Sequence, residues 1–426
     1  MRKIIIYITL LTALGYISCK KQYTPQLASV SVNFLAVDGP IVSGDSTFIR
    51  LSRTTKLSDT TQNKAELKAT VSVENDQKIL FPLTEKGKGV YVLGVTNFDV
   101  ARKYRLNIKT SDGKIYQSDF VPMKVTPAID SIYFKQTDPT EITFYADAHD
   151  DANGTRYYRW DYKDTWAYVP IYHTVYQYKN GIISTVTPDS PDDLSVCYRW
   201  SNSNLIIIGS TAKLAQDVMK QQQLFSITNA SEKIAHVYTI QLHQYALTKE
   251  GFEYYQNLKT NTEQIGSIFD AQPTILTGNI HCITNPTELV IGYVSASTIA
   301  NRQFNLLEKN DPLKAYEVNL NPNYFKVTRY AYPQPFLVDC ISSHDTTSVS
   351  PRPWLLNGPY EGDLNVISLS TRTRLNNAFA KGDSLLFDLG FGAHTVTYIY
   401  APKACVDCRL RFNATNIRPA YFPRIQ

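Results

Sequence analysis

The sequence predicts a mainly β protein, in which an N-terminal immunoglobulin-like β-sandwich precedes a larger β-rich domain with a few helices. Three observations predict this fold class. The 426 residues include 29 Tyr, 18 Phe and 4 Trp but only 3 Met, and aromatic rings suit the pleated, half-buried surface of a sheet. Apolar and polar residues alternate over many short runs, which turn residues separate. A hydrophobic content of 43% suffices for the cores of two or three domains.

The first residues have the pattern of a bacterial lipoprotein signal peptide. Arg2 and Lys3 precede an apolar stretch over residues 4–16, which is too short to span a bilayer. The stretch ends in Tyr16-Ile17-Ser18-Cys19, which resembles a lipobox, although Tyr16 stands where Leu is usual. We therefore expect removal of residues 1–18 and lipidation of Cys19. The alternative is an ordinary cleaved leader, with Cys19 left for a disulfide.

Residues 19–27 are expected to form a lipid-anchored tether. Acyl chains stabilise membrane attachment by about 0.8 kcal/mol per buried CH₂, so the N-terminal lipid is the predicted membrane contact. After loss of Arg2 and Lys3, 41 Lys and Arg remain against 38 Asp and Glu, a net charge of +3. Because these cations are scattered along the chain, the sequence favours no nucleic-acid groove.

Residues 28–122 read as the immunoglobulin-like sandwich. Val30, Val32, Phe34 and Ala36 are expected to share a dry face, and so are Leu67, Ala69, Val71 and Val73. Turn signals occur at Asp38-Gly39-Pro40, Ser43-Gly44-Asp45, Asn75-Asp76, Gly87-Lys88-Gly89 and Asp112-Gly113. Between them lie apolar runs at residues 48–53, 78–83, 90–95, 104–109 and 114–121. Seven short strands in this length are typical of such a sandwich.

The larger β-rich domain is expected over residues 128–426, because the two prolines of residues 122–127 resist helix and inner strand. Its expected strands cover residues 129–135, 141–146, 156–162, 205–208, 235–245, 288–295, 366–370 and 395–400. Two helices are predicted within it. One covers residues 211–222, and Thr248 begins the other, which carries Phe252, Tyr255 and Leu258 on one face.

Several short motifs along the chain follow one another in a familiar order. They are Leu35-Ala36-Val37-Asp38-Gly39, Ile49-Arg50-Leu51-Ser52-Arg53-Thr54, Tyr157-Tyr158-Arg159-Trp160, Ala246-Leu247-Thr248-Lys249-Glu250, Tyr254-Tyr255, Gly266-Ser267-Ile268-Phe269-Asp270, Gly278-Asn279-Ile280, Gly292-Tyr293 and Cys405-Val406-Asp407-Cys408-Arg409. In this order the chain resembles a family of Bacteroidota outer-membrane lipoproteins, domain of unknown function 4249, over nearly all of its mature length. The family usually ends in an aromatic pair with Trp after a Pro, where this chain has Tyr421-Phe422-Pro423.

The resemblance implies a cellular location more than a biochemical activity. Members look like outer-membrane lipoproteins with no established activity, often encoded near TonB-dependent transporters, which implies by association a role beside such a transporter. Fold analogy supplies no more than this. The membrane face stays open between periplasmic and extracellular, because Lys20-Lys21-Gln22-Tyr23 lacks the acidic run that resembles a surface-export signal.

Five cysteines remain once Cys19 is acylated: Cys197, Cys282, Cys340, Cys405 and Cys408. In an exported protein they are candidates for two disulfides and one free thiol. We favour Cys340 paired with Cys405 or Cys408, a loop whose closure would stabilise the fold by about 4 kcal/mol. Redox chemistry is disfavoured, because the Cys-x-x-Cys lacks a following helix. A thiol hydrolase using Cys408 and His394 is the remaining alternative, but the sequence singles out no third group to orient the histidine.

No metal or cofactor motif stands out. Asp147, Asp150, Asp151, Asn153 and Gly154 suggest calcium, but an EF-hand frame with Gly154 at its sixth position places His149 first and Trp160 last, where carboxylates are needed. A polar turn explains these residues better. The seven His include no metalloprotease motif, and no phosphate-binding glycine loop occurs. The sequence therefore predicts no cofactor, no metal and no enzyme.

Aromatic residues are densest over residues 157–200. Most of these rings are expected in the core. Trp166, Tyr168 and Tyr172 are expected to be exposed, because Pro170 and the prolines near residue 190 suggest a loop. Such rings would suit a partner protein or a sugar. The function we predict is a non-catalytic outer-membrane accessory protein that binds a partner, for which a TonB-dependent transporter is the candidate; the alternative is a glycan-binding module.

Overall fold

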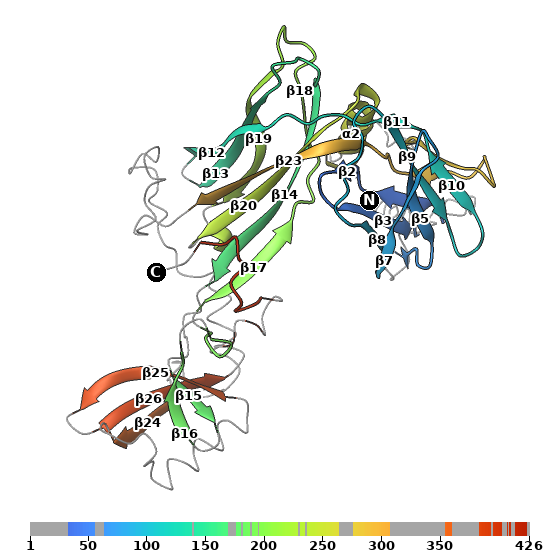
Figure 1. The fold of residues 1–426 in the computed structure, drawn as a ribbon. Coiled ribbons are helices and arrows are strands. Elements are labelled where there is room, and N and C mark those ends of the chain that lie inside the picture. The colour runs from blue at the N-terminus through green and yellow to red at the C-terminus, as the bar shows by residue number, and fades with distance from the viewer. Residues whose placement is uncertain are drawn as a thin grey trace, which may run out of the picture.

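The computed structural model describes residues 33–55, 64–138, 140–168, 176–179, 182–187, 190–194, 196–228, 231–234, 237–263, 276–306, 354–359, 383–392, 395–402, 407, 409 and 414–423. Over these residues the chain is mainly β, with several sheets and one α-helix (Figure 1). This confirms the predicted fold class. Cys19 and the expected strand at residues 366–370 lie outside the described residues.

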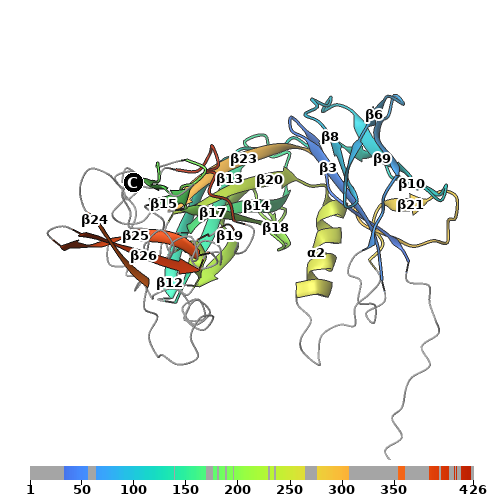
Figure 2. The same cartoon turned by 90° about the horizontal axis from the view of Figure 1, so that it is seen from below.

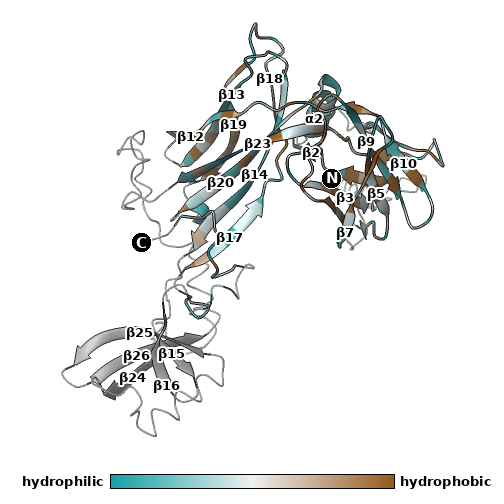
Figure 3. Cartoon of the chain, in the orientation of Figure 1, coloured by the Kyte–Doolittle hydropathy of each residue, from teal (hydrophilic) through white to brown (hydrophobic). Residues whose placement is uncertain are grey.

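Two sheets form the N-terminal sandwich. The first has the order β22-β1-β3-β8-β7 with β4 on β3, and the second has the order β21-β10-β9-β5-β6 with β11 on β9. The strands are β1 Leu35–Asp38, β3 Thr47–Arg53, β4 Lys64–Ala65, β5 Thr70–Asn75, β6 Leu80–Pro82, β7 Thr84–Gly87, β8 Val90–Leu93, β9 Lys103–Lys109, β10 Ile115–Ser118, β11 Val121–Pro122, β21 Ile280–Cys282 and β22 Val290–Ile291. In Figure 3 hydrophobic positions recur along β3 and β5.

Alternation places the core of the sandwich between these sheets. Ile49, Leu51, Val71 and Val73 are buried, while Phe48 is exposed, as period two requires. At β1 the predicted face is wrong: the buried residues are Leu35 and Val37, and Phe34 and Ala36 are only half-buried. A shift of one residue exchanges the two faces of a strand, and apolar residues of both parities made this run ambiguous.

The predicted turns of the sandwich depend on left-handed backbone. Gly39, Gly44 and Gly113 have φ of 126°, 87° and 88°, a region that residues with a Cβ rarely adopt. Between β7 and β8, Lys88 also has a positive φ of 53° and lies between two such glycines. The turn residues therefore set where each strand ends.

The sandwich is completed by a segment far along the chain. β21 pairs antiparallel with β10, and β22 pairs in parallel with β1. Here the backbones approach so closely that a Cβ at Gly278 would lie 1.6 Å from the Gly292 carbonyl oxygen, and a Cβ at Gly292 would lie 2.2 Å from the Val37 carbonyl oxygen. Glycine is required at both positions. Because β21 and β22 pair with strands of the sandwich, the chain contributes to the sandwich again after the prolines of residues 122–127.

The second unit encloses its core between a three-stranded sheet, β12-β13-β19, and a longer sheet, β17-β14-β20-β23-β2, with β18 on β14. The elements are β2 Ile41–Ser43, β12 Ile129–Asp138, β13 Glu141–His149, β14 Tyr157–Tyr168, β17 Cys197–Asn202, β18 Ile207–Ser210, β19 Val218–Thr228, the 3₁₀ turn η1 Glu232–Ile234, β20 Tyr238–Ala246 and β23 Ala296–Leu306. Trp160 is buried at its centre and donates from Nε1 to Gln244 at 2.8 Å.

One of the two predicted helices is present. Helix α2 (Lys249–Glu263) begins after Thr248, whose Oγ1 accepts from the Gly251 backbone N–H at 3.2 Å, as an N-cap does. The helix predicted at residues 211–222 is wrong. Its first half is a loop held by the buried Asp217 carboxylate, which accepts from the Tyr158 and Thr211 hydroxyls, and its second half enters β19. These tertiary bonds outweigh a weak helical pattern.

Strand β23 joins the two units. Its first residues pair in parallel with β2, and the rest pair antiparallel with β20. Thr126, in the linker between the units, adds bonds between its N–H and Thr298 Oγ1 and between its hydroxyl and the Thr298 carbonyl oxygen. Figure 2 shows α2 beside this junction. The units are thus connected by continuous backbone hydrogen bonding.

Two smaller sheets complete the described elements. They are the hairpin of β15 (Tyr176–Lys179) and β16 (Ile182–Thr185), and the sheet β24-β26-β25, formed by Trp354–Pro359, Thr395–Pro402 and Asp383–Gly392. The hairpin lies beside β25 (Figure 1). Among the described helices, none combines the length and the apolar character that crossing a membrane requires.

Candidate functional site

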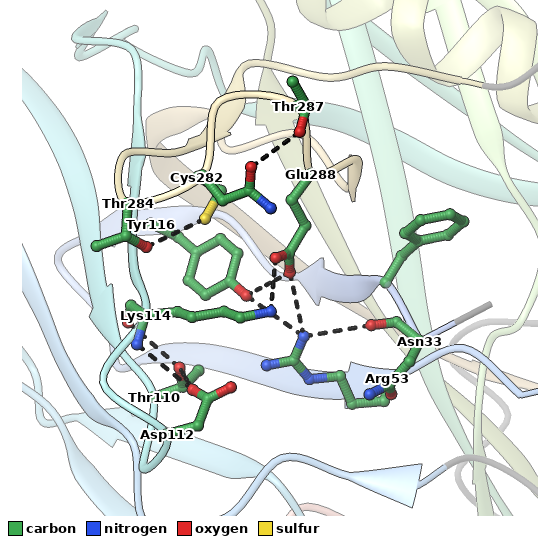
Figure 4. Close-up of polar contacts among 12 residues, drawn as sticks. Asn33, Arg53, Thr110, Asp112, Lys114, Tyr116, Cys282, Thr284, Thr287 and Glu288 are labelled. Atoms are coloured by element: carbon green, nitrogen blue, oxygen red, sulfur yellow. Dashed lines mark hydrogen bonds and ion pairs between the residues drawn. The ribbon is translucent and has the colours of Figure 1, made fainter. Parts of the chain in front are cut away.

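Glu288 lies at the centre of a polar cluster that connects the segment of β21 and β22, residues 280–291, to the rest of the sandwich (Figure 4). Its carboxylate lies 2.6 Å from Lys114 Nζ, 2.6 Å from the Tyr116 hydroxyl and 3.5 Å from Arg53 Nη1. Arg53 also donates from Nε to Glu66 at 2.6 Å. Because opposite charges compensate one another within the cluster, we assign it to folding rather than to ligand binding.

The cluster shifts the pKa values of its members. Burial alone would raise the pKa of Glu288, but hydrogen bonds from Lys114 and Tyr116 and the charges of Lys114 and Arg53 outweigh burial, so the pKa lies below its usual value. Burial, followed by the hydrogen bond to Glu288, raises the pKa of Tyr116. The Tyr116 hydroxyl therefore remains a donor to an ionised carboxylate at neutral pH.

A shallow groove of about 390 Å³ lies over the sheet that contains β10, β9, β5 and β6. Its floor is polar: Glu74 Oε2 accepts from Arg105 Nε at 2.9 Å and from Asn107 Nδ2 at 2.7 Å. Lys78 and Lys109 contribute further cations to its lining. We call this surface the sandwich groove.

Exposed apolar side chains border the sandwich groove. Leu80 lines it from the edge strand β6 and is 58% exposed, and the neighbouring Ile79 is 51% exposed. Arg105, which is hydrogen-bonded to the lining residue Glu74, has its guanidinium 4.6 Å from the centre of the exposed Phe120 ring. Aromatic residues and arginine are enriched at protein interfaces. The groove is therefore the surface of the sandwich best suited to a partner protein.

A second candidate surface lies on the long sheet of the other unit. We call it the polar face and define it by six residues in two rows across β14, β20 and β23: Asp161, His243 and Asn301 in one row, and Lys163, Gln241 and Gln303 in the next. Same-parity residues of a strand share a face, and these residues point away from the core formed by their neighbours Tyr162, Leu242 and Phe304.

Each end of the polar face is closed by another element. At one end Arg159 donates to the Tyr255 hydroxyl of α2 at 2.9 Å and to Asp161 at 3.3 Å. At the other end lies the C-terminal segment 414–423, dark red beside β17 in Figure 1, whose Tyr421 contacts the sheet. The Tyr421 hydroxyl lies 2.8 Å from Thr165 Oγ1, and Gln303 Nε2 donates to the Tyr421 carbonyl oxygen at 3.0 Å.

The aromatic residues predicted to be exposed are not exposed where the structure describes them. Trp166 and Tyr168 are 4% and 6% exposed, so this prediction is wrong for both; Tyr172 lies outside the described residues. Strand β14 continues through Tyr168 and pairs with β17 on one side and β20 on the other. Pro170, which suggested a loop, lies outside the described residues.

The polar face was missed by sequence reasoning, although a signal was present. Polar residues of one parity occur at Arg159, Asp161 and Lys163, and again at Gln241 and His243. This alternation identifies a solvated face on each strand. It does not show that the strands are neighbours, which depends on the register of pairing.

The structure describes two of the five candidate disulfide cysteines, Cys197 and Cys282. Cys197 is disulfide-bonded. Cys282 is a buried free thiol beside Thr284 Oγ1 at 3.4 Å, which removes it from the candidate disulfide partners. Its position in β21, facing the sandwich core, explains why it is kept as a small apolar side chain. Cys340, Cys405 and Cys408 lie outside the described residues, and so does His394.

The acidic segment near Asp150 forms a polar turn. Asp150 accepts from the backbone N–H groups of Ala152, Gly154 and Thr155, and Asn153 has a φ of 53°. The Asp150 carboxylate thus stabilises the turn by accepting hydrogen bonds from the backbone of the residues that follow it. Within the described ranges, no group of three or more His, Cys, Asp or Glu side chains is placed to hold a metal ion.

The two joined units and their exposed sheet faces define a β-rich protein built around an immunoglobulin-like sandwich. The chain belongs to the family described as Domain of unknown function (DUF4249), which matches residues 20–303. A search of curated proteins finds no match.

Two solved structures are distantly similar. A two-domain fibronectin type III segment of chicken tenascin is 9% identical, with a TM-score of 0.13, over 50% of this chain and 90% of that chain. The FN1–FN3 domains of chicken CNTN1 are 14% identical, with a TM-score of 0.15, over 50% of this chain and 62% of that chain. The sheets themselves, rather than these likenesses, carry the fold assignment.

Proposed function

We propose that this protein is a non-catalytic accessory protein that is anchored to the outer membrane by a lipid at Cys19 and binds a partner protein, a TonB-dependent transporter being the expected one. The sandwich groove carries the proposal, because exposed Ile79 and Leu80 lie beside a polar floor, where Glu74 is hydrogen-bonded to the neighbouring Arg105. Interfaces combine these features. The apolar leader and Cys19, together with the resemblance to a lipoprotein family, support the anchor.

The surroundings of His243 support a non-catalytic role. Its Nδ1 lies 2.8 Å from Asp161 Oδ1, an arrangement that could orient a general base. Its neighbours on the polar face are the Gln241 and Asn301 side chains, whose amides are not nucleophiles. The hydroxyls of the row beyond Lys163 and Gln241, those of Thr165 and Thr239, are engaged by Tyr421 and Asn305.

The anchor predicts a specific chemical modification. Cells fed a clickable palmitate analogue should label the native chain, and the mature protein should begin at Cys19. Cys19→Ser should abolish the labelling and release the chain from the membrane fraction, because removing the acylated thiol removes all buried CH₂ groups of the anchor. Cys282→Ser, which changes a buried free thiol, is the matched control and should remain labelled. A native N-terminus elsewhere, without acyl chains, would contradict the anchor.

The partner interface predicts a loss of association from one surface change. Cross-linking of intact cells should recover an outer-membrane transporter with the native chain. Leu80→Glu should reduce this recovery by about tenfold or more, because a charge would be desolvated at the centre of the contact. Leu205→Glu changes a leucine that is 42% exposed outside the groove, and it should leave recovery unchanged. Equal recovery with both variants would exclude the groove as the interface.

A further inference from the structure

The polar face has the dimensions of a small ligand site. Neighbouring strands lie about 4.8 Å apart, and successive residues on one face of a strand lie about 6.7 Å apart. The two rows of three residues therefore cover about 10 Å by 7 Å, which suits one or two sugar rings. Arg159 and Tyr245 bound the face at the α2 end, and Tyr421 bounds the other end.

One cation of the polar face, Lys163, has no carboxylate partner among the described residues. Asp161 is the carboxylate of the face, and it already lies between Arg159 at 3.3 Å and His243 at 2.8 Å. Lys163, one position further along β14, makes no ion pair with any described residue. Its ammonium instead lies 5.9 Å from the Trp200 ring and 5.6 Å from the Tyr421 ring. Arg159 is compensated by Asp161 and by the nearby charge of Asp38, whereas Lys163 has no carboxylate partner among the described residues, so an anionic ligand complements Lys163.

Neutral hydrogen-bonding groups surround Lys163. Gln241 lies opposite it on β20, and Asn301 lies in the adjoining row of β23. Neither amide has a hydrogen-bond partner among the described residues, and each can both donate and accept. His243 Nε2 is likewise without a hydrogen bond to any described group. Such groups suit neighbouring hydroxyls, which need a donor and an acceptor at short spacing.

An aromatic wall stands beside these groups. Trp200 lies opposite Thr165, on the same face as Lys163, and is 48% exposed. An exposed indole ring can bury the apolar face of a sugar while the polar edge of the sugar stays hydrated. Trp200 is therefore the stacking residue of this surface, in place of the buried Trp166.

We propose that the polar face binds an acidic saccharide, with the sugar carboxylate on Lys163, its hydroxyls on Gln241 and Asn301, and one ring stacked on Trp200. A peptide strand fits less well, because β14 and β20 have paired strands on both sides and offer no free backbone edge. Nucleic acid fits less well too, because a single excess cation falls short of the several phosphate contacts that it requires. This site is separate from the sandwich groove.

The test uses the full chain in detergent micelles and calorimetric titration with galacturonate oligomers of four to six rings. Neutral galactose oligomers of the same length are the comparison. The native chain should bind the acidic oligomers at least tenfold more tightly than the neutral ones, and added salt should reduce the difference. Failure to bind galacturonate oligomers, or equal affinity for acidic and neutral ones, would overturn the proposal. If inorganic phosphate at the same concentration displaced the galacturonate oligomers completely, the site would bind anions without recognising sugar, and this too would overturn the proposal.

Two variants separate the charge from the stacking. Lys163→Gln should remove the preference for acidic oligomers while leaving weak binding to both kinds, and Trp200→Ala should weaken both by about tenfold. Lys213→Gln and Leu214→Ala change exposed residues elsewhere on the same unit and should bind as the native chain does. Unchanged affinity in Lys163→Gln would overturn the assignment. All variants should keep the native thermal unfolding, and transporter recovery through the groove should be unaffected.

Discussion

Asp164→Ala is expected to lower the free energy of unfolding by about 4 kcal/mol, because it strips a buried set of donors of their shared acceptor. The Asp164 side chain is 1% exposed. One carboxylate oxygen accepts from Lys233 Nζ at 2.6 Å and from the Tyr238 hydroxyl at 2.9 Å, and the other accepts from the Ser201 hydroxyl at 2.5 Å. Burial, reinforced by the charge of Asp164, raises the pKa of Tyr238, so its hydroxyl stays a donor that needs this acceptor.

The loss would be concentrated where β14, β17 and β20 meet. Without Asp164, the Lys233 ammonium would keep the Ser201 hydroxyl at 3.1 Å and the Trp166 ring, whose centre lies 4.9 Å away, but no carboxylate. Urea unfolding followed by tryptophan fluorescence would measure the change. Asp164→Asn keeps one acceptor and should cost less, whereas Asp151→Ala, at a carboxylate that is 97% exposed, should change stability by less than about 0.5 kcal/mol. A loss below about 1 kcal/mol in Asp164→Ala would show that these bonds contribute little.

Glu288→Ala is expected to destabilise the protein by about 3 kcal/mol, because it leaves the buried Tyr116 hydroxyl and part of the Arg53 guanidinium without their partner. The Glu288 side chain is 9% exposed and Arg53 is 7% exposed. Glu288 precedes β22, so its loss should loosen β21 and β22 first, which hydrogen exchange of their amides would detect. Glu85→Ala, at a half-buried glutamate of β7, provides the comparison. Unchanged hydrogen exchange in β21 and β22 would show that the Glu288 cluster does not hold these strands on the sandwich.

The same carboxylate should contribute to acid sensitivity. The pKa of Glu288 in the folded state lies below its usual value of 4.5. A depressed folded-state pKa adds stability that is present above the unfolded pKa and is lost as pH falls through the folded value. The native chain should therefore lose stability below about pH 4.5, and Glu288→Gln should lose less over that window. Identical slopes for the two proteins between pH 5 and 3, measured by urea titrations, would contradict this linkage.

The sandwich could largely be predicted, because its signals are local. The glycines at residues 39, 44 and 113 predict turns from the sequence alone, and in the structure they have the positive φ that such turns require. Helix α2 was predictable for the same reason, since its cap and buried face lie within eleven residues of Thr248. The errors at β1 and at residues 211–222 arose where a local pattern was ambiguous and a distant partner decided. Asp217, for example, is held by Tyr158, 59 residues away.

The candidate surfaces were less predictable than the fold. Trp166 was expected at the surface, but the long β14 carries it into the core. The polar face needs three strands in register, contributed by residues 161–163, 241–243 and 301–303. The sandwich groove likewise joins residues from β5, β6, β9 and β10.

By itself, the sequence determined the β-rich class, the turns of the sandwich and the helix that Thr248 caps, because backbone preference and side-chain period act over a few residues. Only the tertiary structure decided that residues 280–291 complete the sandwich and that β23 serves both units. The Glu288 cluster spans 235 residues of sequence between Arg53 and Glu288. Contacts over such separations depend on strand register and on the compensation of buried charge, which no local pattern encodes.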